Sequence, residues 1–272
     1  MHKPRKRFGQ NFLHDQHVIQ QIIYAINPTT EQTLVEIGPG KGAITIPLLH
    51  LVNKLEAIEL DRDLIPLLQE KVKGMQQNNC QQFGDLLIHE ADALEFEYCT
   101  LADKKKKLRL IGNLPYNIST PLLLHLLKQA YCIQDMHFML QKEVVDRIVA
   151  LPENKAYGRL SVIIQYHCMV ESLFKISRGA FSPPPKVESA FIRLIPYEKP
   201  PYEAKDITLL ELVTSKAFGQ RRKILRNSLK ELLTEDQILN LDIDPGLRAE
   251  ALNIKQYVAL SNQLYLNQNC SE

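Results

Sequence analysis

Apolar and polar positions up to residue 195 predict strands that alternate with helices. Short apolar runs are typical of buried strands, and segments whose apolar residues recur every three or four positions are typical of helices. The predicted strands are residues 33–37, 55–60, 86–90, 108–112, 136–141, 160–166 and 188–195. The predicted helices are 16–27, 43–52, 62–73 and one that starts at Pro121, with Ser119 or Thr120 as its N-cap. This alternation predicts an α/β fold, a parallel sheet with helices on both faces.

The pattern changes after the proline-rich segment 196–201, which is typical of a linker. Beyond it only helical spacing is found, over residues 206–218, 220–233, 235–240, 246–252 and 254–265. Thr234 and Gln237 have the spacing of a capping box. The sequence therefore predicts two domains, residues 1–198 and a small all-helical C-terminal domain, residues 199–272.

Composition narrows the class of protein. The 272 residues are 45% hydrophobic and 24% charged, as in ordinary soluble globular proteins. No apolar run approaches the ~20 residues that span a bilayer, and the basic N-terminus lacks the apolar core of a signal peptide. We therefore expect a cytoplasmic protein that does not enter a membrane.

The cysteines and histidines give no metal-binding pattern. The five cysteines contain no C-x-x-C pair, and the eight histidines contain no H-E-x-x-H motif. We expect free thiols in a reducing compartment, and no bound metal. The cysteines are Cys80, Cys99, Cys132, Cys168 and Cys270.

A glycine-rich loop, Gly38-Pro39-Gly40-Lys41-Gly42, stands between a predicted strand and a predicted helix. Glycines there allow a sharp turn and the close approach of a ligand. Glu59 ends the next strand, 21 residues after Gly38, where a carboxylate accepts hydrogen bonds from a ribose diol. The loop and this carboxylate together suit an adenosine-containing cofactor. The spacing of the glycines, G-x-G-x-G, differs from that of NAD enzymes and from that of a P-loop. Asp92 ends the third strand region, and by this position we expect it to hold an adenine amino group, with a solvated loop acid as the alternative. A tight turn without a ligand is the alternative for the loop taken alone.

The tetrapeptide Asn113-Leu114-Pro115-Tyr116 follows strand 108–112, at the edge where open α/β sheets bind ligands. The exocyclic amine of adenine is a poor nucleophile because its lone pair is delocalised into the ring. A site that methylates this amine must accept hydrogen bonds from its N–H groups as positive charge develops on the nitrogen. The Asn113 side-chain oxygen and the Leu114 carbonyl can supply these acceptors, and Pro115 fixes the direction of that carbonyl. Tyr116 offers a ring face for an extruded base. The alternative is an ordinary turn with a core tyrosine.

Together these motifs resemble the ribosomal RNA adenine N6-dimethyltransferase family, in its bacterial small-subunit branch. The resemblance spans nearly the whole chain, through residues 7–13, 36–45, 58–61, 111–116, 157–161, 181–189, 218–223 and 248–250. It implies a Rossmann-like class I methyltransferase fold and S-adenosyl-L-methionine as cofactor. It implies Asn113, Leu114, Pro115 and Tyr116 as catalytic residues. The cofactor contacts it implies, with Gly40 added from the glycine loop, are Asn11, Leu13, Gly38, Gly40, Glu59, Asp92 and Asn113.

The substrate that the resemblance implies is a pair of adjacent adenosines in the hairpin loop near the 3′ end of 16S rRNA. Each would receive two methyl groups within a small-subunit assembly particle, from an enzyme that we expect to be monomeric and to serve subunit biogenesis as well. Three alternatives stay open. They are a 23S rRNA dimethyltransferase of the macrolide-resistance type, a DNA adenine methyltransferase, whose usual D-P-P-Y differs from this chain, and an assembly checkpoint in which binding matters more than methylation.

Phe181 precedes three prolines that stiffen its loop. We hypothesise that its ring closes over the second face of the flipped adenine and so belongs to the catalytic set. A core phenylalanine is the alternative.

The net charge of +2 argues at face value against nucleic-acid binding, but the positive charges are clustered. Residues 1–7 and 216–230 are rich in lysine and arginine and contain no acidic residue. Arg222 and Arg226, four positions apart on a predicted helix, would share a face. We predict phosphate contacts at both clusters, with a solvated helix as the alternative for the second. The predicted RNA-binding residues are Lys3, Arg5, Lys6, Arg7, Arg221, Arg222, Lys223 and Arg226.

Overall fold

The computed structural model describes residues 11–78, 83–103, 106–220 and 222–269. The chain divides into two compact units. The first comprises Met1–Val145 and Glu171–Pro196, and the second comprises Asp146–Val170 and Tyr197–Glu272. Residues 146–170 therefore group with the C-terminal helices. The division into a methyltransferase domain, residues 1–198, and a C-terminal domain, residues 199–272, stays a prediction.

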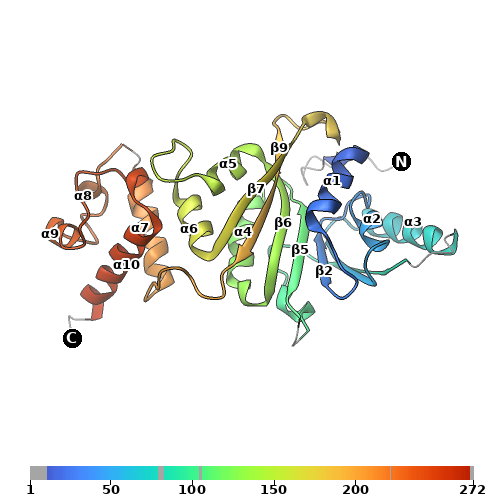
Figure 1. Ribbon diagram of the computed structural model, residues 1–272, viewed down its shortest axis with the longest axis horizontal. Coiled ribbons are helices and arrows are strands. Elements are labelled where there is room, and N and C mark those ends of the chain that lie inside the picture. The colour runs from blue at the N-terminus through green and yellow to red at the C-terminus, as the bar shows by residue number, and fades with distance from the viewer. Residues whose placement is uncertain (1–10, 79–82, 104–105, 221, 270–272) are drawn as a thin grey trace. The chain divides into compact units, whose positions relative to one another are not determined.

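A seven-stranded sheet runs in the order β4-β3-β2-β5-β6-β9-β7 (Figure 1). The strands are β2 (Thr33–Ile37), β3 (Lys54–Glu59), β4 (Asp85–Glu90), β5 (Leu108–Asn113), β6 (Ile133–Gln141), β7 (Cys168–Ile176) and β9 (Ser189–Pro196). Strands β2 to β6 pair in parallel, and β9 pairs antiparallel to β6. The strand order reverses between β2 and β5. Ligands bind beside the carboxyl ends of the strands at such a reversal.

Helices cover both faces of this sheet. In Figure 1, α1 (Gln16–Ile26) crosses in front of the strands and α4 (Ser119–Lys128) lies behind them. Side chains of α1, of α2 (Thr45–Leu49) and of α3 (Leu64–Asn78) share one hydrophobic cluster with the strands. The buried leucines of α4 belong to the opposite face. The predicted α/β sheet with helices on both faces is confirmed.

A short two-stranded sheet accompanies the large one. Strand β1 (Phe12–Leu13) pairs antiparallel with β8 (Phe181–Ser182), and the His14 N–H donates to the Ala180 carbonyl at 3.0 Å. The segment just before α1 is thereby joined to the segment just before β9.

The second unit is largely helical. It contains α6 (Arg159–His167), α7 (Ile207–Gly219), α8 (Leu225–Ser228), α9 (Glu235–Leu239) and α10 (Ile254–Asn269). Its core holds a row of rings in which Phe218 stacks on Tyr257 and meets Tyr157 edge-on. The predicted capping box is present, since Gln237 N–H donates to Thr234 Oγ1 at 3.2 Å and Thr234 N–H donates to Gln237 Oε1 at 3.0 Å. Helix α5 (Lys142–Val149) begins in the first unit and ends in the second.

Residues 160–166, predicted as a strand, form α6 instead. The run Leu-Ser-Val-Ile-Ile-Gln-Tyr is buried on nearly every side, and such a run carries no period that separates strand from helix. A local polar contact starts the helix: Ser161 Oγ accepts from the Gly158 N–H at 3.0 Å. Strand β7 had no clear signal because it is at the edge of the sheet and largely exposed.

The predicted helix 220–233 is also wrong. Only Leu225–Ser228 is α-helical there, and the Lys223 N–H closes a turn on the Gln220 carbonyl. The Leu225 N–H donates to the Leu247 carbonyl at 2.8 Å, so contacts with a distant segment fix the chain. Arg222 and Arg226 therefore do not share a helix.

Two smaller predictions are wrong as well. The N-cap of α4 is Ile118, where Ser119 or Thr120 was predicted. Residues 246–252, predicted as a helix, contain only the short 3-10 turn Ala249–Ala251.

The expectation of free thiols is wrong for two cysteines. Cys99 and Cys132 form a disulfide between two short turns, η2 (Tyr98–Leu101) and η3 (Ala130–Cys132). Their Cα atoms lie 5.6 Å apart although 33 positions separate them in sequence. No short sequence motif predicts a pairing over this separation. Cys168 is free and buried, and Cys80 and Cys270 lie outside the described residues.

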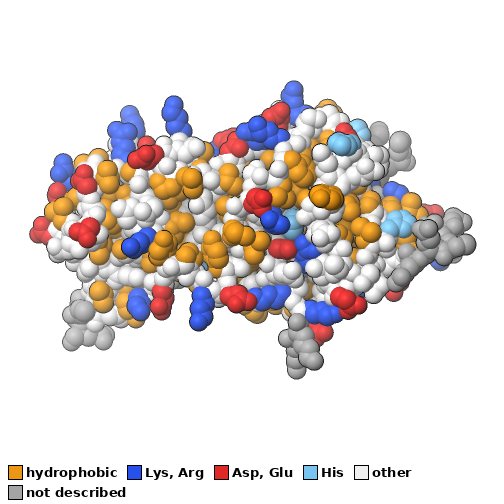
Figure 2. Space-filling view, viewed as in Figure 1, with side chains coloured by type: hydrophobic (Ala, Val, Ile, Leu, Met, Phe, Trp, Pro, Cys, Tyr) orange, Lys and Arg blue, Asp and Glu red, His pale blue; other side chains and the backbone are white. Residues whose placement is uncertain are grey.

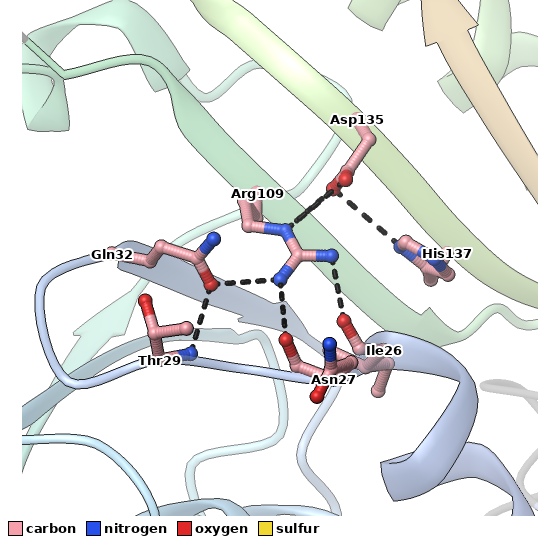
Figure 3. Close-up of polar contacts among 7 residues, drawn as sticks. All are labelled: Ile26, Asn27, Thr29, Gln32, Arg109, Asp135 and His137. Atoms are coloured by element: carbon pink, nitrogen blue, oxygen red, sulfur yellow. Dashed lines mark hydrogen bonds and ion pairs between the residues drawn. The ribbon is translucent and has the colours of Figure 1, made fainter.

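A buried arginine ties the end of α1 to two strands (Figure 3). Arg109, in β5, is 5% exposed and donates from Nε to both carboxylate oxygens of Asp135 in β6, at 2.9 and 3.1 Å. Its terminal nitrogens donate to the carbonyls of Ile26 and Asn27 at the end of α1. Burial alone would raise the pKa of Asp135, but the neighbouring His137, with Nδ1 3.5 Å from Oδ1, and the hydrogen bonds from Arg109 outweigh it and hold that pKa below its ordinary value. Each partner thus compensates the buried charge of the other.

Candidate active site

A cavity of about 310 Å³ opens at the carboxyl ends of β2, β3 and β5 in the first unit. The loops that follow these strands form its walls, together with the segment that contains β1. Sites predicted from separate motifs meet here. The predicted residues that line the cavity are Asn11, Leu13, Gly38, Gly40, Glu59, Asp92, Asn113, Leu114, Pro115 and Tyr116.

The glycine loop after β2 adopts a backbone that favours glycine. Gly38 and Gly40 have φ values of +68° and +57°, in the left-handed region that other residues rarely enter. A Cβ on Gly40 would also lie 3.3 Å from the Phe12 ring, tighter than ordinary contact. The Gly38 N–H donates to the Ile58 carbonyl at 2.9 Å, which holds the loop against β3. The bare backbone therefore faces the cavity.

Glu59 joins the glycine loop to the next strand. Its carboxylate accepts hydrogen bonds from the Gly40 N–H at 3.1 Å and the Asp61 N–H at 2.9 Å. Burial raises the pKa of Glu59, and these two bonds offset part of that rise. The carboxylate oxygens keep further lone pairs for a ligand such as a ribose diol. Asp92, which also lines the cavity, uses Oδ1 to accept from the Leu94 N–H at 2.9 Å, which shapes its turn.

Hydrogen bonds hold the tetrapeptide Asn113–Tyr116, which begins at the last residue of β5. Asn113 Nδ2 donates to the Asn11 carbonyl at 3.0 Å, and the Leu114 N–H donates to the Met139 carbonyl at 3.2 Å. Because the amide nitrogen of Asn113 is bound to the protein, its side-chain oxygen is the atom left to accept a hydrogen bond from a ligand. The Tyr116 hydroxyl lies 2.7 Å from Ser189 Oγ. The site thus presents an acceptor and an aromatic ring from fixed positions.

Glu36, at the fourth position of β2, is a cavity residue for which no role was predicted. It is 2% exposed and accepts a hydrogen bond from Thr45 Oγ1 at 2.6 Å. Burial raises the pKa of Glu36 to about 7; the Thr45 bond lowers it and the nearby Glu59 raises it further. An acid inside an otherwise apolar strand was the available signal.

Phe181 does not join this cavity. Its ring is 2% exposed and packs in the hydrophobic cluster beneath α1, while β8 pairs it with Leu13. This placement is the one expected of a core phenylalanine, the alternative for this residue. That Phe181 covers the flipped adenine stays a prediction.

Three of the predicted phosphate contacts lie among the residues that the structure describes. Lys3, Arg5, Lys6, Arg7 and Arg221 fall outside the described residues. Arg222, Lys223 and Arg226 are exposed in the second unit, and Arg226 pairs with Glu235 at 3.3 Å. On the face drawn in Figure 2, positive and negative side chains are interspersed, in keeping with the small net charge.

Two other kinds of feature are absent from the described ranges. No group of three or more His, Cys, Asp or Glu side chains there is placed to hold a metal ion. No helix of the described chain has the length and apolar character needed to cross a membrane.

A family model described as ribosomal RNA adenine dimethylase matches residues 1–265. The chain belongs to this family. The family predicted from the motifs is therefore confirmed, and with it the assignment of an rRNA adenine dimethyltransferase.

Curated relatives are similar over nearly their whole length. The chain is 53% identical over 264 residues to the ribosomal RNA small subunit methyltransferase A of Hahella chejuensis, covering 97% of this chain and 94% of that protein. It is 53% identical over 263 residues to the protein of the same name from Pseudomonas aeruginosa, with coverage of 97% and 95%.

Solved structures share the fold. A dimethyladenosine transferase from Plasmodium falciparum has a TM-score of 0.78 at 23% identity, covering 95% of this chain and 98% of that one. The 23S rRNA methyltransferase ErmE has a TM-score of 0.69 at 23% identity, covering 94% and 100%. The predicted class I methyltransferase fold is confirmed.

The raised pKa of Glu36 predicts a pH effect on stability. Between pH 4.5 and 7 the folded chain keeps a proton on Glu36 that the unfolded chain has released, so raising the pH destabilises the fold. From pH 5 to pH 8 the wild type should lose about 2.5 kcal/mol of unfolding free energy relative to Glu36→Gln. Urea denaturation at the two pH values measures this. The exposed control Glu95→Gln should follow the wild type, and parallel behaviour of wild type and Glu36→Gln would contradict the account.

Proposed function

We propose that this chain transfers methyl groups from S-adenosyl-L-methionine to the N6 amines of two adjacent adenosines in the 3′-terminal hairpin loop of 16S rRNA. The observation that carries the proposal is the meeting of Glu59, the glycine loop and Asn113–Tyr116 in one cavity. The family assignment and the relatives named for the small subunit support it.

The cavity residues fit the cofactor. Glu59 would hold the ribose hydroxyl groups, the backbone at Gly38 and Gly40 would let the ligand approach closely, and Asp92 would accept from the adenine amino group. Asn11 and Leu13 complete the wall beside the glycine loop. When bound, S-adenosyl-L-methionine supplies a methyl group activated by a positively charged sulfur.

The chain's own contribution is positioning. The Asn113 side-chain oxygen and the Leu114 carbonyl accept hydrogen bonds from the N–H groups of the target amine. These bonds favour the pyramidal geometry that the nitrogen adopts as it attacks the methyl group. The Tyr116 ring stacks on the extruded base, a contact worth roughly 1–3 kcal/mol. Asn113 is neutral, so the site needs no buried negative charge beside the reacting amine. Holding both reactants in this geometry removes much of the entropic part of the barrier.

The proposed partner is 16S rRNA within the small subunit or its assembly precursor, met by a monomer in the cytoplasm. The small-subunit relatives favour this substrate over 23S rRNA. A contribution to subunit assembly beyond methylation is compatible with the same binding event.

Transfer of tritium from S-adenosyl-L-methionine tests the function. Undermethylated small subunits should be labelled and large subunits should not. Asn113→Ala should bind the cofactor but reduce transfer by about 100-fold or more, since a stabilising interaction in the transition state is removed. Labelling of large subunits alone would favour the 23S alternative, and full activity of Asn113→Ala would refute the role of that residue.

We propose that Arg222, Lys223 and Arg226, which are exposed in the second unit, contact rRNA phosphates, together with Lys3, Arg5, Lys6, Arg7 and Arg221. Replacing Arg222 and Lys223 by alanine should weaken binding to small subunits. The dependence of log K on log salt concentration should become shallower by about 0.7–0.9 for each phosphate that is no longer neutralised. Lys199→Ala with Lys255→Ala removes the same charge from exposed positions elsewhere in the unit and serves as control. Equal slopes for the two double variants would contradict the assignment.

A further inference from the structure

Ser189 touches the catalytic tetrapeptide from outside it. Its Oγ lies 2.7 Å from the Tyr116 hydroxyl, and Ser189 is completely buried. The cavity walls do not include it. A buried hydroxyl needs a hydrogen-bond partner, and here the partner is the far end of the aromatic ring that faces the cavity.

The position of Ser189 is rigid. It is the first residue of β9 and pairs with Gln141, the last residue of β6. Ala190, Phe191 and Ile192, which follow it, are almost fully buried. The Glu188 carbonyl, just before it, accepts from the Lys142 N–H at 2.9 Å. The hydroxyl is therefore presented from the sheet rather than from a loop.

The other bonds near Tyr116 act on its backbone. Ser119 Oγ donates to the Tyr116 carbonyl at 3.2 Å, and the Ile118 N–H donates to the Pro115 carbonyl at 3.1 Å. They close the turn that follows β5 but leave the direction of the ring to the side-chain torsions. The hydrogen bond with Ser189 acts at the opposite end of the ring and restricts those torsions.

We propose that Ser189 is a positioning residue, which holds the Tyr116 ring ready to stack on the target adenine. The proposal rests on the proposed function. A ring already fixed in its stacking direction gives up less side-chain freedom when the base arrives, so more of the stacking energy is available to hold the amine in place. Burial also raises the pKa of Tyr116, opposed by the Ser189 bond, so the phenol is neutral at physiological pH and fit for this hydrogen bond.

The test is a double-mutant cycle on methyl transfer to undermethylated small subunits. Ser189→Ala and Tyr116→Phe should each lower kcat by about tenfold, the size expected for one hydrogen bond to a positioned group. The double variant should have a kcat no lower than either single variant, because both substitutions remove the same hydrogen bond. The dissociation constant of S-adenosyl-L-methionine should not change in any of them. Ser172→Ala, at an exposed position of β7, is the matched control and should keep the wild-type kcat.

Wild-type kcat in Ser189→Ala, or decreases that multiply in the double variant, would overturn the proposal while leaving the proposed function intact. A wild type that labels no subunit would refute the proposed function instead. A second measurement tests the hydrogen bond itself and does not depend on activity. It is the NMR chemical shift of Tyr116 ¹³Cζ, a resonance identified by its absence from the spectrum of Tyr116→Phe. A shift of this resonance in Ser189→Ala but not in Ser172→Ala supports the hydrogen bond, and no shift overturns it.

Discussion

Parallel pairing of β2, β3 and β5 is the constraint on which the site depends. Parallel strands all end at one edge of the sheet, so the three loops that follow them must meet there. One hydrogen bond joins two of these loops directly, from the Gly40 N–H to the Glu59 carboxylate. The buried Arg109–Asp135 pair acts at the other end of β5, where it ties α1 to the sheet.

The catalytic tetrapeptide takes its precision from neighbours that are distant in sequence. Asn11 lies 102 positions before Asn113, and Ser189 lies 73 positions after Tyr116. The small β1–β8 sheet links the two segments that supply these neighbours. Asn11 thus sets the direction of the Asn113 amide, and Ser189 sets the direction of the Tyr116 ring. Fixed groups of this kind favour the transition state without reorganisation during the reaction.

Local chemistry made part of this predictable. Gly38, Glu59 and Asn113 each lie at the carboxyl end of a predicted strand. Alternating strands and helices predict a parallel sheet, whose strands have their carboxyl ends at one edge. The sequence therefore predicted that these residues share a cavity. Residues 160–166 could not be assigned by pattern, because burial on all sides erases the period. The Cys99–Cys132 disulfide and the hydrogen bond between Ser189 and Tyr116 join segments far apart in the chain, so no local pattern of residues predicts them. Phe181 was predicted from the prolines that follow it, a pattern that does not show its burial among apolar residues.

The central claim is that the cavity beside β2, β3 and β5 holds the cofactor next to Asn113. A crystal structure of the chain with S-adenosylhomocysteine, the product of methyl transfer, tests it most directly. The account predicts density in this cavity, with the ribose hydroxyl groups in contact with Glu59. Ligand bound elsewhere, or a ribose that does not reach Glu59, would contradict it.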